Sequence, residues 1–97
     1  MGLSTPQTVA FAIHGPIRRD DLPGLCDRVC ALLTASGAPV ALCRVDGVAP
    51  DAVTVDALAR LQLAARRHGC QIRLIGASVE LCDLVAFMGM RDVIPGT

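Results

Sequence analysis

The sequence predicts an α/β fold: a small, mainly parallel β-sheet of about four strands packed against about three helices. Two observations predict it. Short β-rich apolar runs alternate with longer stretches whose apolar residues recur at helical spacing, and glycine, proline and aspartate punctuate the boundaries. Strands that alternate with helices need crossover connections, which are right-handed and make neighbouring strands parallel. We expect residues 1–97 to form a single domain.

Four segments have the character of strands. Residues 8–13 (TVAFAI) come first, and their near-continuous apolarity indicates burial on both faces of the sheet. An apolar run at residues 40–43 precedes the turn-forming Asp46 and Gly47. Residues 71–75 (QIRLI) are a third strand, and residues 90–95 are expected to add a short fourth one.

The first helix is expected to start at an Asp20 or Asp21 cap, to hold Pro23 in its first turn and to end at Ser36 and Gly37. Its apolar residues form one stripe, consisting of Leu22, Leu25, Cys26, Val29, Leu32 and Leu33. The third helix is expected to have Ser78 as its N-cap and Gly89 just after its end. Its stripe consists of Leu81, Leu84, Val85 and Met88.

The second helix is expected to start near Asp51 and to run to about His68, where Gly69 ends it. Its core face consists of Val55, Leu58, Leu61 and Ala65, and its polar face consists of Asp56, Arg60 and Arg67. Leu63 projects on the polar side. The loop before this helix lies at the carboxyl end of a strand, where functional residues often gather.

Composition excludes several classes of function. Nine basic and nine acidic residues cancel, so electrostatics do not favour binding to nucleic acid. Although 53% of the residues are hydrophobic, no apolar segment approaches the roughly 20 residues that span a bilayer. We therefore expect no membrane insertion and a cytoplasmic location, with self-association through exposed apolar surface as a further expectation.

Five cysteines, an odd number within apolar patterns, fit a reducing compartment better than a disulfide framework. We expect all five to behave as small hydrophobes: Cys26, Cys30, Cys43, Cys70 and Cys82. A redox switch that uses Cys43 or Cys70 is the alternative, and it requires a proximity that spacing does not supply.

Catalytic patterns are absent from the sequence. Cys26 and Cys30 have no second pair to complete a zinc motif, and His14 and His68 stand isolated at element ends. The glycines form neither a dinucleotide fingerprint nor a P-loop. We expect no catalytic residues, no metal site, no cofactor and no enzymatic activity.

The second half of the chain resembles a STAS domain, the module named for sulfate transporters and anti-sigma factor antagonists. In that family a strand ends in an Asp-Leu-Ser-Gly-Val-like segment, and a loop carries Asp-Ser-Ser-Gly-Leu. A helix, a glycine, a strand and a helix with a Leu-x-x-x-Gly-Leu-like ending follow. The matching segments here, in the same order, are residues 45–48 (VDGV), Asp51, residues 58–61 (LARL), 68–75 (HGCQIRLI) and 78–90 (SVELCDLVAFMGM).

The sequence departs from this family at two places. In antagonist members the second serine of the loop motif is phosphorylated by an anti-sigma kinase, which releases the partner. Counting back from Gly69 gives Val53 at that position, whereas counting forward from Val48 gives Thr54. We take Thr54 as the candidate phospho-acceptor, with a first-turn threonine without chemistry as the alternative. Arg44 stands where the family often has an acidic residue.

The resemblance implies a regulatory module that binds a kinase-type anti-sigma factor. The alternatives are a soluble STAS subunit of a lipid-type ABC transporter, which would bind the other transporter components, and a small enzyme. We expect a docking surface at the loop and the helix start, because backbone donors, short side chains and apolar area occur there together. Its residues are Asp51, Val53, Thr54, Val55, Asp56, Arg60 and Leu63.

Overall fold

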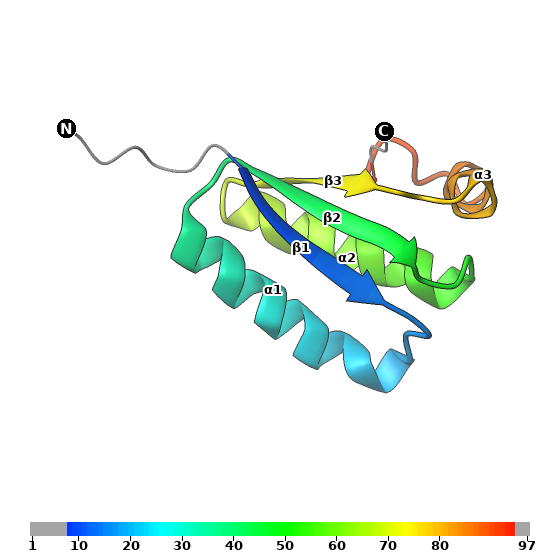
Figure 1. The fold of residues 1–97 in the computed structure, drawn as a ribbon, viewed down its shortest axis with the longest axis horizontal. Helices are drawn as coiled ribbons and strands as arrows, with labels where there is room; N and C mark the ends of the chain where they lie inside the picture. The colour runs from blue at the N-terminus through cyan, green and yellow to red at the C-terminus, as the bar shows by residue number, and fades with distance from the viewer. Residues whose placement is uncertain (1–7, 95–97) are drawn as a thin grey trace.

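A computed structural model describes residues 8–94 and shows an α/β arrangement in which strands and helices alternate (Figure 1). A short 3₁₀ turn, η1, precedes the first helix. In chain order the elements are β1 (Thr8–His14), η1 (Arg19–Asp21), α1 (Leu22–Ser36), β2 (Val40–Gly47), α2 (Ala52–Arg67), β3 (Gln71–Ile75) and α3 (Val79–Phe87).

The three strands form one parallel sheet in the order β1-β2-β3. Thr8 pairs with Val40, and Val40 pairs in turn with Gln71. Parallel crossovers are right-handed, so a strand order that follows the chain order places α1 and α2 on the same face. In Figure 1, α2 passes behind the strands, α1 lies below them, and α3 lies beyond the carboxyl end of the sheet. The predicted parallel sheet and three helices are thus confirmed.

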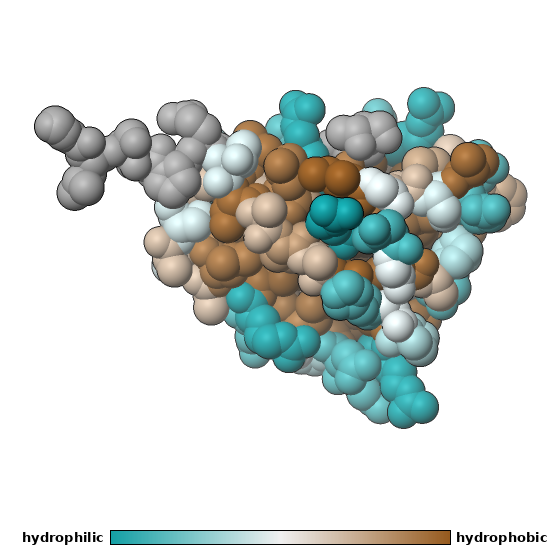
Figure 2. Space-filling model, in the orientation of Figure 1, coloured by the Kyte–Doolittle hydropathy of each residue, from teal (hydrophilic) through white to brown (hydrophobic). Residues whose placement is uncertain are grey.

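The other face of the sheet is open, which corrects the expectation that the first strand is buried on both faces. Every second residue of β1 is exposed, beginning with Thr8 and ending with His14. The same face of β2 and β3 carries Leu42, Arg44 and Arg73. Apolar side chains gather over the strands on this side, with hydrophilic ones among them (Figure 2). The expectation fails because both crossover helices cover the opposite face.

A fourth strand is not present within the described residues. Residues 91–93 form a turn and residue 94 a bend, and Pro95 lies outside the described part of the chain. Gly89 has a φ of 72°, which ends α3 in the left-handed conformation that favours glycine. The Val93 and Ile94 amides then both donate to the Met90 carbonyl, at 3.0 and 2.8 Å. These local bonds coil the segment and bury Ile94, whereas strand pairing would need an extended backbone.

The predicted caps are largely confirmed. Asp51 caps α2, and the Ser78 hydroxyl accepts from the Leu81 amide at 3.1 Å at the start of α3. Asp21 is the residue before α1, but its carboxylate accepts from the amide of Arg18, the residue before η1, at 3.3 Å and caps nothing in α1 itself. The extra 3₁₀ turn explains the difference, because it places Asp21 in a helical conformation already.

The core lies between the sheet and the helices α1 and α2. Side chains of β2 such as Ala41, Cys43 and Val45 are almost completely buried there. The predicted core face of α2 is confirmed, since Val55, Leu58, Leu61 and Ala65 are all buried. Within the described residues, no helix is long and apolar enough to span a bilayer.

Candidate functional site

The start of α2 is fixed by its own N-cap. Asp51 has an extended backbone, and its Oδ1 accepts a hydrogen bond from the Thr54 amide at 2.8 Å. This bond satisfies one of the amides that the first turn of a helix leaves unpaired. The carboxylate of Asp51 is exposed and also lies favourably at the positive end of the helix dipole. The loop therefore ends in an ordered, negatively charged helix start.

Two residues of the predicted docking surface point inward instead. Thr54 and Val55 are both 0% exposed, so neither can contact a partner while α2 keeps this position. The Thr54 Oγ1 atom has no hydrogen-bond partner among the described residues. Val53, the other residue that counting placed at the phospho-acceptor position, is half-buried and has no hydroxyl. Neither of the two positions that counting gave, Val53 or Thr54, therefore exposes a hydroxyl group to a kinase.

The sequence contained a signal for this burial. Thr54 precedes Leu58 by four residues and Leu61 by seven, so helical periodicity places it on the core face. Gln62 is a second buried polar residue that the sequence reasoning missed, and it follows Leu58 by four. Its amide group bonds both backbone polar groups of Ile72. Thr54 and Gln62 both occupy core positions of the helix, although their residue types are polar.

The outer face of α2 carries the other predicted residues. Asp56 is partly exposed, and its Oδ2 accepts from Arg19 Nη1 and from Arg60 Nε, each at 3.2 Å. Leu63 lies nearly two turns beyond Asp56 and is 52% exposed, as the sequence predicted. Asp51, Val53, Asp56, Arg60 and Leu63 therefore remain accessible. The structure brings Asp56 and Arg60 together and adds an unpredicted neighbour, Arg19 of η1.

The shared carboxylate holds the arginine head groups close together. Arg19 and Asp56 are 37 positions apart in the sequence, so no local pattern could reveal their contact. Arg60 also lies near Cys26 of α1, where its positive charge opposes the pKa increase that burial causes in that thiol. Exposed ion pairs contribute little to stability, typically less than about 1 kcal/mol. Their main effect here is to orient charged groups on a surface that also contains Leu63.

Arg44, which replaces an acidic residue common in the resembled family, lies elsewhere. It is exposed on the open face of the sheet, where Nη2 is 3.5 Å from Asp46 Oδ2. The two charges neutralise each other at the carboxyl end of β2. The departure therefore affects the sheet face and leaves the outer face of α2 unchanged.

The histidines lie at separate places. His14 is at the end of β1 and packs against Gly47, where an added Cβ would lie 3.0 Å from its Nδ1 and would displace the exposed imidazole slightly. His68 Nδ1 is 3.5 Å from Thr34 Oγ1 at the surface. Within residues 8–94, no three histidine, cysteine or acidic side chains gather in a way that could hold a metal ion.

The cysteines differ in exposure. Cys43 and Cys70 are buried and Cys26 and Cys30 are partly buried, whereas Cys82 is exposed, which corrects the expectation of a buried thiol there. Burial raises the pKa of Cys43 to about 12 and also raises the pKa of Cys70. Since the thiolate is the reactive form, these two positions are unsuited to a redox switch.

Cys43 should make stability fall at alkaline pH. Its folded pKa lies above the unfolded one, so the folded state binds more protons between about pH 9 and 12 and stability decreases as pH rises through that range. The chain has no lysine and no tyrosine, so the side chains that titrate there are the five cysteines, and the contribution of Cys43 has to be obtained by difference. At pH 10.5 we expect Cys43 to cost about 2 kcal/mol relative to pH 8.

This expectation can be checked by urea unfolding at pH 8 and 10.5, with Cys43→Ala as the comparison. The variant is expected to be less stable at pH 8 because it has a smaller core side chain, but it should lose less stability on going to pH 10.5. Equal losses in the two proteins would contradict the burial of Cys43.

No family model matches the chain, and no curated protein matches it either.

Proposed function

We propose that the chain is a non-enzymatic regulatory module of the STAS type, which binds a kinase-type anti-sigma factor through the outer face of α2. The observation that carries this proposal is the cluster in which Arg19 and Arg60 share the Asp56 carboxylate beside the exposed Leu63. The parallel α/β fold is compatible with the STAS resemblance of the sequence.

The docking surface of this proposal consists of Asp51, Val53, Asp56, Arg60 and Leu63, with Arg19 added from η1. An interface typically surrounds an apolar contact with a polar rim, and arginine is common in interfaces. Leu63 provides the apolar contact and the ion-paired side chains provide the rim. Because Asp56 already orients the arginines, less side-chain entropy is lost when a partner binds.

Phosphorylation of Thr54 does not belong to this proposal. A kinase would first have to pull the first turn of α2 out of the core, since the hydroxyl is buried. Regulation through this surface would instead depend on partner concentration or on changes in the partner. Self-association remains a separate prediction, for which the open sheet face offers apolar area.

A pull-down from native cell extract, read by mass spectrometry, tests the docking surface. We expect the wild-type protein to capture a kinase-type anti-sigma factor. Arg60→Glu combined with Leu63→Asp should weaken capture at least tenfold, because it reverses a rim charge and places a carboxylate at the apolar contact. The matched control is Arg73→Glu, a charge reversal on the open face of the sheet.

The outcomes separate the candidate functions. Loss of the anti-sigma factor with the double variant, but not with the control, supports the proposal. Capture of ABC transporter components favours the transporter alternative. Equal capture of a partner by wild type and double variant would overturn the assignment of this surface, whichever partner it is.

A further inference from the structure

A cavity of about 720 Å³ lies between β3, α3 and the turns after α3, away from the outer face of α2. Its volume falls within the range of small-molecule sites. The lining residues come from all three segments, and most of them have apolar side chains. The apolar lining side chains are Leu74, Ala77, Leu81, Val85, Ala86 and Ile94.

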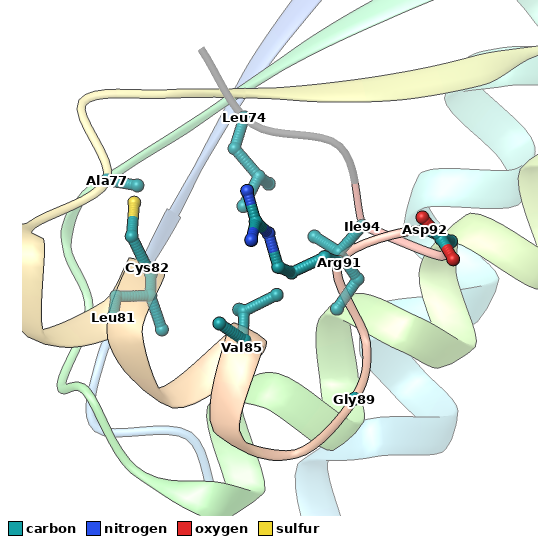
Figure 3. Close-up of a pocket in the computed structure, with 10 residues that line it drawn as sticks. Leu74, Ala77, Leu81, Cys82, Val85, Gly89, Arg91, Asp92 and Ile94 are labelled. Atoms are coloured by element: carbon teal, nitrogen blue, oxygen red, sulfur yellow. The ribbon is translucent and has the colours of Figure 1, made fainter.

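One cationic side chain, that of the exposed Arg91, lies among these apolar side chains. Figure 3 shows Arg91 reaching across the middle of the pocket toward Leu74, with Val85 below it and Cys82 to one side. Asp92, the acidic residue of the lining, lies at the margin and is directed away from the guanidinium group. None of the ion pairs among the described residues involves Arg91.

A guanidinium group without a carboxylate partner retains its capacity for two parallel hydrogen bonds to a planar anion. The pocket supplies one such group among mostly aliphatic side chains, with the Asp92 carboxylate at its margin and the Cys82 thiol at one side. Polyphosphates and nucleotides usually need several cationic or backbone donors, which this lining does not provide. The arrangement instead matches a ligand with one carboxylate and a short hydrocarbon chain.

We propose that this pocket binds an aliphatic monocarboxylate. The carboxylate pairs with Arg91, and the hydrocarbon chain contacts Leu74, Leu81 and Val85. Cys82 borders the site as an exposed thiol and takes no chemical part in binding. This site is separate from the docking surface on α2, so either proposal can fail without the other.

Isothermal titration with decanoate below its micelle concentration tests the site, with decanol and acetate as comparison ligands. We expect saturable binding of decanoate and at least tenfold weaker binding of the other two, since each lacks one half of the recognised chemistry. Arg91→Gln should weaken decanoate binding at least tenfold, the factor expected when a charge-assisted hydrogen bond is lost. Ala86→Trp, which fills the pocket, should weaken it similarly.

Arg67→Gln is the matched control, because it removes an exposed arginine of α2 that belongs to neither proposed site and should leave decanoate affinity unchanged. Circular dichroism on each variant verifies that the fold is retained. The proposal is overturned if decanoate does not bind saturably, if decanol binds as tightly as decanoate, or if Arg91→Gln binds like the wild type. Equal weakening by Arg67→Gln and Arg91→Gln would also overturn it, since it would indicate nonspecific attraction to positive charge.

Discussion

Replacing Gln62 by methionine should lower the free energy of unfolding by about 2–4 kcal/mol, although methionine is similar in size and more hydrophobic. Gln62 is 1% exposed, and its Nε2 donates to the Ile72 carbonyl at 2.9 Å. The Ile72 amide donates to Gln62 Oε1 at 2.8 Å. The side-chain amide thus satisfies both polar groups of one β3 residue, as a neighbouring strand would.

The cost arises from what the substitution leaves behind. Methionine fills the space but cannot donate to the Ile72 carbonyl or accept well from its amide, so two buried backbone groups lose their partners. Each such group costs about 1–3 kcal/mol. Gln62→Glu keeps the acceptor and loses the donor, and it places a carboxylate against the Ile72 carbonyl. It should be at least as destabilising at neutral pH.

Urea unfolding followed by circular dichroism measures the effect. Leu63→Met, one residue further along the same helix, is the matched control and should change stability by less than about 0.5 kcal/mol because Leu63 is exposed. A Gln62→Met protein as stable as the wild type would mean that the bonds to Ile72 contribute nothing in solution.

Elements whose signals are local were predictable from the sequence. Periodicity and caps located α2 and α3, because Asp51 and Ser78 act through hydrogen bonds only three residues long. The sheet's open face was not predictable in this way. A strand with one exposed face normally alternates apolar and polar residues, whereas a strand buried on both faces is apolar throughout. In β1 the exposed positions include Ala10 and Ala12, so its sequence looks like that of a strand buried on both faces.

Among the proposed docking residues, too, only features with a local sequence signal could be predicted. The exposure of Leu63 followed from its place on the helix, whereas the Arg19 contact to Asp56 depends on how η1 lies against α2 and had no local signal. The pocket around Arg91 was missed for a similar reason. It exists because residues 90–94 coil back after α3, where the sequence suggested a strand.

Thr54 provides the second large effect, in which two substitutions should act in opposite directions. Thr54→Val exchanges a buried hydroxyl that has no partner among the described residues for a methyl group of similar size, and it should raise stability by about 0.5–1.5 kcal/mol. Thr54→Glu would force an unpaired charge into the core beside Leu58. We expect it to cost about 4 kcal/mol or more, a large part of the stability of a small domain.

Urea unfolding of both variants decides between a core threonine and a regulatory one. The same experiment determines how a phosphomimetic test can be interpreted, because loss of partner binding by an unfolded Thr54→Glu protein would say nothing about a switch. If Thr54→Glu unfolds like the wild type while Thr54→Val is destabilised, the hydroxyl is accessible in solution and the phospho-acceptor hypothesis regains its basis. The expected opposite result would remove Thr54 as a phospho-acceptor and leave the outer face of α2 as the proposed docking surface.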